Sequence, residues 1–242
     1  MKRLGFALLM LALAACSSAP PPVATLPPPV RTGPPRGIDM PNDARDVSNE
    51  LKSSGLDFVA RYYRDPASRG PTLSAGEAAL LSSSGFKIVA IWESHSHQPQ
   101  YFSYAAGFAD AVNAYRQARA VGQPFGSAIY FAVDYNAQQP DIYGPVDRYF
   151  RGVAAGLASV GGSTQYKVGV YGSGAVCGYL KHMRLAQYAW LSNSRAWTGY
   201  NDFSTWNIRQ LPASAALSFG HDWNEATEDY GGFQVKNQFT AL

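Results

Sequence analysis

Short apolar segments of strand character alternate with helical patterns along this chain from Gly37 onward, and this alternation limits the possible folds. The predicted strands lie at residues 37–40, 56–63, 86–92, 128–133, 166–171, 188–191, 206–211 and 217–222. The segment Ala128–Val133 is continuously apolar, as expected for a strand that is buried on both faces. Repeated βα units with this number of strands predict an α/β fold, a TIM-type (β/α)8 barrel. An open doubly wound sheet is the alternative, because periodicity alone does not prove closure.

Helices are predicted between most of the earlier strands. One begins at a capping box formed by Ser74 and Glu77 and should stop near Gly85. Further helical patterns lie at residues 108–115, 142–157 and 175–182. No long helical pattern follows Trp197, so the late helices of the barrel are expected to be short or missing.

The N-terminal residues have the pattern of an export signal. Basic Lys2 and Arg3 precede an apolar run that ends at Ala15 and is too short to span a bilayer. The following Leu-Ala-Ala-Cys resembles the lipobox of bacterial lipoproteins, in which the signal is removed and the cysteine receives a lipid. We predict a signal peptide over residues 1–15 and lipidation of Cys16. An ordinary secretory signal with an incidental cysteine is the alternative.

A proline-rich segment separates Cys16 from the folded part of the chain. Residues 17–36 read SSAPPPVATLPPPVRTGPPR, a composition that favours extended polyproline II. At about 3.1 Å per residue, this tether reaches up to roughly 60 Å. We therefore predict a lipidated cysteine and tether over residues 16–35 and one barrel domain over residues 36–242. The protein is expected to be exported and anchored to a membrane, on the periplasmic face of the outer membrane if the cell is Gram-negative.

Charge and cysteine content narrow the classes of function. The formal net charge is +3 and charged residues form no blocks, which argues against nucleic acid as the partner. Once Cys16 carries lipid, Cys177 has no partner within the chain, so the domain must be stabilised by its core. The 15 tyrosines suit a cleft that stacks on sugar rings, although they can equally fill a core.

Four predicted strand-like segments end on a carboxylate. They are GID at Asp39, VAIWE at Glu93, IYFAVD at Asp134 and SFGHD at Asp222. In a barrel of parallel strands, all strand C-termini open onto one face, so we expect these acids to share one cleft. Glycoside hydrolysis uses a pair of carboxylates. The alternative is that each acid caps the helix or turn that follows it.

The order of motifs resembles a known family. The motifs are GID, FVARYY, FKIVAIWE, IYFAVDYN, YKVGVYGS, YAWLSNS and HDWN. Together they resemble the Rv2525c-like glycoside hydrolase-like domain, once called DUF1906, which is similar to the family 25 lysozymes. The resemblance covers about residues 36–235 and implies a TIM-type barrel with an acidic cleft for a cell-wall glycan of the peptidoglycan type. Those lysozymes carry Asp-x-Glu after the fourth strand, with Glu as the acid, whereas Asn136 stands here and cannot transfer a proton.

We therefore predict a different acid for a glycoside hydrolase. Glu93 is the proposed general acid, with a pKa raised by desolvation next to Trp92 or other rings. Asp134 is the proposed nucleophile or electrostatic stabiliser. Asp39 and Asp222 would position water or the acetamido group of the substrate.

Four further residues are predicted to bind substrate. Arg61 lies inside an apolar segment, so it must point into the cleft or pair with a carboxylate. Its expected partner is one of Asp39, Glu93 and Asp134. Tyr135 and Trp223 directly follow two of the acids and are candidates for sugar stacking. Gln210 ends the seventh predicted strand.

Two other functions remain open. A glycan-binding lipoprotein without catalytic activity is favoured by Asn136. A metal-dependent hydrolase or deacetylase would use His95 and His97, an His-x-His pair, together with Glu93 and Asp134. The main interpretation requires no cofactor and no metal, and its partners are cell-wall glycan and, through the lipid, the membrane.

Overall fold

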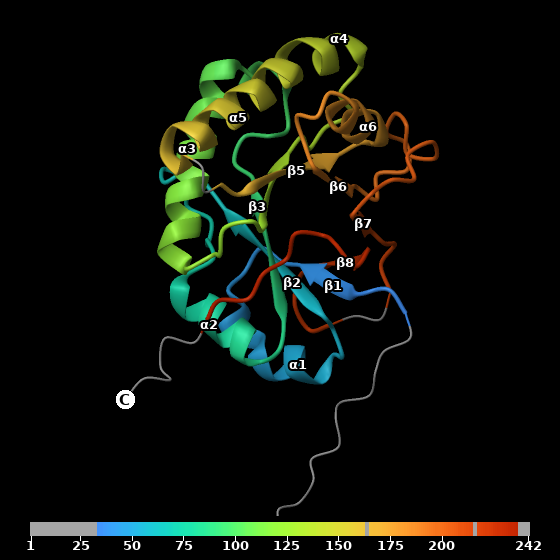
Figure 1. Ribbon diagram of the computed structural model, residues 1–242. Helices are drawn as coiled ribbons and strands as arrows, with labels where there is room; N and C mark the ends of the chain where they lie inside the picture. The colour runs from blue at the N-terminus through green and yellow to red at the C-terminus, as the bar shows by residue number, and fades with distance from the viewer. Residues whose placement is uncertain (1–32, 163–164, 215–216, 237–242) are drawn as a thin grey trace, which may run out of the picture. The chain divides into compact units, whose positions relative to one another are not determined.

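Eight strands close into a barrel in chain order in the computed structural model, which describes residues 33–162, 165–214 and 217–236 (Figure 1). The strands are β1 (Arg36–Asp39), β2 (Phe58–Tyr63), β3 (Lys87–Trp92), β4 (Ala128–Ala132), β5 (Lys167–Gly172), β6 (Tyr188–Leu191), β7 (Ile208–Gln210) and β8 (Asp222–Ala226). The predicted TIM-type barrel is confirmed, and the open sheet is excluded by the pairing of β8 with β1. The predicted signal peptide, Cys16 and most of the tether lie outside the described residues.

The last strand differs from its prediction in position and direction. β1 to β7 pair in parallel, whereas β8 is antiparallel to both β7 and β1. The predicted strand over residues 217–222 is wrong, because β8 begins at Asp222 and continues to Ala226. Since β8 runs in the opposite direction, its first residue lies where the parallel strands end.

Helices cover the early part of the barrel (Figure 1). They are η1 (Ala44–Val47), α1 (Ser48–Ser53), α2 (Ala75–Ser83), η2 (Pro99–Tyr101), α3 (Tyr104–Val121), α4 (Gln139–Asp141), η3 (Ile142–Val146), α5 (Asp147–Gly161) and α6 (Gly174–His182). Among the described residues no helix follows α6, which confirms that the late helices are missing. None of the described helices combines the length and apolar character needed to cross a membrane.

At the start of α2, one of the two hydrogen bonds of the predicted capping box forms. The Ser74 hydroxyl accepts a hydrogen bond from the amide of Glu77 at 3.2 Å. The Glu77 carboxylate, however, is buried and accepts from the amide of Ala44 and from Arg61. Gly85 follows the helix with a φ of 93°, as expected for its C-terminal stop.

Glycines allow α3 and α5 to approach each other closely. A Cβ atom added to Gly107 would lie 2.0 Å from the carbonyl oxygen of Tyr149. One added to Gly152 would lie 2.1 Å from the carbonyl oxygen of Tyr104. The backbones of the two helices are therefore in direct contact at these positions.

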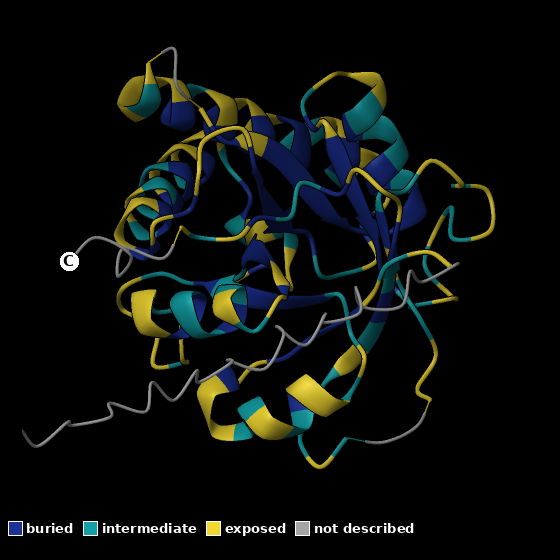
Figure 2. Ribbon diagram, turned by 60° about the horizontal axis from the view of Figure 1, so that its bottom comes forward, coloured by how far each residue is buried: buried dark blue, intermediate teal, exposed yellow. Residues whose placement is uncertain are grey.

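Strand alternation divides the core into two clusters. Phe58, Ala60 and Tyr62 of β2 belong to the cluster inside the barrel, whereas Val59 and Tyr63 pack between the barrel and the helices. Figure 2 shows the strands buried beneath helices whose outer faces are exposed. Since successive side chains of a strand point to opposite faces, this alternation decides which side chains beyond each strand reach the barrel mouth.

Candidate active site

A cavity of about 180 Å³ lies at the mouth of the barrel, where the parallel strands end. It is lined by Asp39, Tyr62, Ile91, Glu93, Asp134, Tyr171, Trp190, Gln210 and Asp222. All four predicted acids and Gln210 are among these residues. This is the face on which barrels of this type carry their active sites.

Asp222 reaches the cavity by a route other than the predicted one. It is the first residue of an antiparallel strand, not the last of a parallel one, and it pairs directly with Asp39. The prediction that Asp39 and Asp222 are neighbours is therefore correct, but the direction assumed for the strand that carries Asp222 was wrong. Asp222 is exposed, whereas Asp39 is only 5% exposed.

Asp39 accepts three side-chain hydrogen bonds. Its Oδ1 accepts from the hydroxyl of Tyr62 at 3.2 Å. Its Oδ2 accepts from Nδ2 of Asn224 at 2.7 Å and from Nε2 of Gln210 at 3.2 Å. Burial raises the pKa of Asp39 to about 6, and the negative charge of Asp222 adds to this, although the three donors oppose it. Asp39 is therefore a carboxyl group that changes protonation in the weakly acidic range.

The two amide side chains that hold Asp39 are themselves oriented by aromatic residues. Trp190 donates its indole N–H to Oδ1 of Asn224 at 2.8 Å. Tyr171 donates its hydroxyl to Oε1 of Gln210 at 3.1 Å. Each amide is left with its NH2 group facing the carboxylate, so the network presents donors to Asp39.

Sequence reasoning missed Asn224 and Tyr62 as parts of this network. Strand alternation could have indicated both. Tyr62 lies on the same face of β2 as Ala60, and Asn224 is two residues beyond Asp222.

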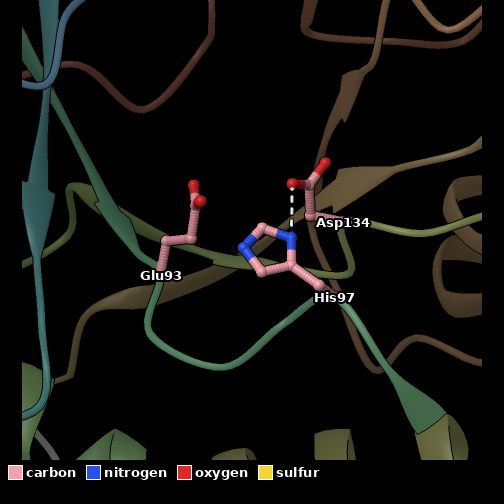
Figure 3. Close-up of side chains that lie close together, drawn as sticks. All are labelled: Glu93, His97 and Asp134. Carbon is pink, nitrogen blue, oxygen red and sulfur yellow. Dashed lines mark ion pairs between the residues drawn. The ribbon is translucent and has the colours of Figure 1, made fainter.

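Glu93 and Asp134 line the cavity, and Figure 3 shows the ring of His97 between their side chains. One side-chain oxygen or nitrogen of each residue lies within 4.8 Å of the others. Nδ1 of His97 is 2.9 Å from Oδ2 of Asp134. The site thus contains a close pair of carboxyl groups, one of which is paired with an imidazole.

The two carboxyl groups of this pair differ in environment. Burial, followed by repulsion from Asp134, raises the pKa of Glu93 to about 7. Burial also raises the pKa of Asp134, but His97 opposes that shift. Desolvation of Glu93 was predicted, although Trp92 packs on the helix-facing side of β3 and not in the cavity. Glu93 is thus suited to hold a proton near neutral pH.

The same three groups are the described residues that could hold a metal ion. An imidazole and two carboxylates are donors that zinc accepts, and a catalytic zinc site has three protein ligands. Of the predicted His-x-His pair, only His97 takes part. The ring of His95 packs against Tyr101 with centroids 5.6 Å apart.

Arg61 does not line the cavity, so its predicted substrate-binding role is wrong, whereas the alternative of pairing with a carboxylate is correct with a partner other than Asp39, Glu93 or Asp134. It is fully buried and forms an ion pair with Glu77 at 2.5 Å between Nε and Oε1. Its Nη1 also donates to the carbonyl oxygen of Met40 at 2.7 Å. The reason is alternation, since residue 61 points away from the barrel interior, toward α2.

The two predicted stacking residues do not line the cavity. The ring of Tyr135 packs against Phe102 with centroids 5.7 Å apart. The ring of Trp223 meets His221 edge-on at 5.2 Å. Asn136 has a structural contact, because its Oδ1 accepts hydrogen bonds from the amide and hydroxyl of Thr198 at 2.9 and 3.1 Å.

A larger cavity of about 540 Å³ lies at the opposite end of the barrel, lined in part by Lys87 and Lys167 at strand N-termini. Its size does not make it the candidate active site, because chemistry in these barrels is built at the C-terminal face.

The closed eight-stranded barrel with four acids at its mouth has the architecture of TIM-type barrel proteins. The chain belongs to the family of the Rv2525c-like, glycoside hydrolase-like domain, whose model matches residues 49–239. This confirms the family that the sequence motifs indicated.

The chain is also similar to individual proteins. FadG of Bacillus subtilis strain 168 is 31% identical over 151 residues, which cover 61% of this chain and 26% of FadG. The chain therefore spans about a quarter of the length of that relative.

The Tat-secreted protein Rv2525c of Mycobacterium tuberculosis, solved with L-tartrate, has a similar structure, with a TM-score of 0.65 and 21% identity. The match covers 83% of this chain and 99% of that one. A lysozyme from Streptomyces coelicolor matches with a TM-score of 0.53 and 15% identity, covering 83% and 94%. At these identities the two structures show a common fold.

Proposed function

We propose that this protein cleaves glycosidic bonds in cell-wall glycan of the peptidoglycan type, with Glu93 as the general acid and Asp134 as its partner. The observation that carries the proposal is the pair of carboxyl oxygens within 4.8 Å of each other in the barrel-mouth cavity. The lysozyme-like fold supports the substrate class.

The spacing of the pair favours retention of configuration. Carboxyl groups about 5–5.5 Å apart are typical of retaining glycosidases, whereas inverting enzymes keep about 6.5–9.5 Å to admit a water molecule. Glu93 and Asp134 fit the shorter class. Asp134 would then attack the sugar directly, or stabilise the positive charge while the substrate's acetamido group attacks.

The protonation states suit these roles. With a pKa of about 7, Glu93 holds a proton near neutrality and can donate it to the leaving oxygen. His97 next to Asp134 favours the ionised form of that carboxylate. Asp39 and Asp222, together with the hydroxyls of Tyr62 and Tyr171, would position water or the acetamido group.

We also propose that the protein works at the cell surface. A lipid on Cys16 would anchor it to a membrane, and the proline-rich tether would hold the barrel within reach of the wall. Both features rest on the sequence of the N-terminal segment.

The proposal is tested by measuring reducing ends released from purified peptidoglycan. Glu93→Gln and Asp134→Asn should each lower the rate by about 100-fold or more, because each removes a group that acts in the transition state. Glu228→Gln, an exposed glutamate at the opposite end of the barrel, is the matched control and should leave the rate unchanged. Undiminished release by both site variants would refute the assignment.

Two other outcomes would identify the alternatives. If the wild type releases nothing but is retained on peptidoglycan, it is a glycan-binding lipoprotein, in keeping with the structural contact of Asn136. If a chelator and His97→Ala both abolish release of acetate from the same glycan, the three-donor group is the centre of a metal-dependent deacetylase.

A further inference from the structure

A second cavity on the same side of the barrel has the chemistry of a sugar-binding site. It has a volume of about 630 Å³ and lies between the segment that follows β4 and helix α6. Figure 1 shows α4 next to α6 in this region. Its lining includes Gln138, Tyr143, Tyr179, His182 and Thr198.

Tyr143 presents an exposed aromatic face in this cavity. Its side chain is 58% exposed, and it lies in η3, a π-helical segment. Such segments are rare and are frequently found at functional sites. The ring lies 4.9 Å from that of Tyr179, whose hydroxyl donates to Asp147 at 3.0 Å. The pair of rings is therefore held in place.

Amide and hydroxyl groups surround these rings. Nε2 of Gln138 donates to Oγ1 of Thr198 at 3.3 Å and to the carbonyl oxygen of Asn136 at 2.9 Å. The residues that line the cavity include no Asp, Glu, Lys or Arg. Aromatic faces combined with amide, hydroxyl and imidazole groups, and with no carboxylate, ammonium or guanidinium group, match a neutral sugar ring better than a charged peptide.

The cavity is close to the candidate catalytic pair along the chain. Gln138 is four residues beyond Asp134, so their Cα atoms are at most about 14 Å apart. The contact between Asn136 and Thr198 fixes the segment that joins them. This separation is within the length of an oligosaccharide of a few sugar units.

We propose that this cavity is a distal subsite that binds a neutral sugar of the same glycan chain, with Tyr143 as its stacking platform. The inference rests on the proposed function for the identity of the ligand. The distal subsite would raise the affinity for long glycan chains without contacting the bond that is cleaved.

The test compares the binding of two probes by calorimetry in a Glu93→Gln background, so that cleavage does not interfere. The probes are the disaccharide and the tetrasaccharide of β-1,4-linked N-acetylglucosamine. Tyr143→Ala should weaken tetrasaccharide binding by about fivefold or more and leave the disaccharide unaffected. Tyr104→Ala removes a tyrosine that is 50% exposed on α3 and is absent from the cavity lining, and should change neither.

The outcomes separate this inference from the proposed function. Equal tetrasaccharide affinity with and without Tyr143, or no tetrasaccharide binding in the parent, would overturn the subsite. Weaker binding of a sugar-free stem peptide, with sugar binding unchanged, would overturn it in favour of a peptide site. If the subsite behaves as expected but the wild type releases no reducing ends, the subsite stands and the hydrolase proposal falls.

Discussion

At the scale of single residues, the four acids share a cavity but differ in surroundings. Asp39 is buried and accepts three side-chain hydrogen bonds, whereas Asp222 is exposed. Glu93 is desolvated by burial, and Asp134 is paired with His97. The sequence predicted all four because each ends a strand-like stretch of residues, although Asp222 in fact begins β8. It did not predict these differences, which arise from side chains contributed by other strands.

Burial of Asp39 predicts a stability that depends on pH. Its pKa rises from 3.8 to about 6 on folding, so the folded state binds the proton more tightly. The free energy of unfolding therefore falls by up to about 3 kcal/mol as pH rises from about 4 to about 6, because the folded state then has to give up this more tightly bound proton. Asp39→Asn removes the charge. Its amide oxygen can accept from Asn224 and Gln210, and its NH2 group can donate to the hydroxyl oxygen of Tyr62, which in the wild type donates to Asp39. We expect the variant to gain up to about 3 kcal/mol at pH 7 and little at pH 4.

Urea unfolding at pH 4, 5.5 and 7 measures this difference. Asp46→Asn, which changes an exposed acid in η1, is the control and should show no comparable dependence on pH. A difference between Asp39→Asn and wild type that is constant across the three pH values would contradict the explanation.

At the scale of elements, short patterns predicted most strands and helices but not how they pack. The strand periods of β2, β3 and β4 are visible locally, and these strands form where expected. The helix predicted over residues 142–157 is divided between η3 and α5. The direction of β8 was not predictable in this way, because it is set by pairing with β1 and β7. Helix contact is likewise a property of two elements together, as at the glycines of α3 and α5.

Gly152→Ala should destabilise the domain by about 3 kcal/mol, because the new methyl group overlaps the carbonyl oxygen of Tyr104 and the helices must separate. Gly178→Ala in α6 is the matched control. Its added Cβ would lie 3.6 Å from Phe203, an ordinary contact, so its higher helix propensity should stabilise by up to about 1 kcal/mol. Thermal unfolding of the two variants measures both changes in stability. Equal melting temperatures would contradict the claim that the close contact of α3 and α5 excludes a methyl group at residue 152.

At the scale of the whole molecule, a rigid barrel is predicted to act at the end of a lipid-anchored tether. The anchor in this prediction is the lipid on Cys16, which rests on the sequence of the N-terminal segment.

Cys16→Ala is expected to move the protein from the membrane fraction to the soluble fraction and to abolish its diacylglycerol modification. Fractionation of cells and mass spectrometry of the purified protein measure the two effects. Cys177→Ala is the matched control, because that cysteine is buried in α6 and should leave lipidation intact. A Cys16 variant that remains in the membrane fraction would contradict the anchor.

The sequence alone indicated repeated βα units, the family and the four acids of the cavity. These properties are encoded locally, in apolar periodicity and in short motifs. Tertiary structure decided between a closed barrel and an open sheet, because closure depends on the pairing of β8 with β1. Tertiary structure alone decided that Arg61 pairs with Glu77, that β8 is antiparallel and that Asn224 binds Asp39. The last contact joins residues 185 positions apart in the chain. No local pattern specifies such a contact, because it exists only once the barrel closes and brings its first and last strands together.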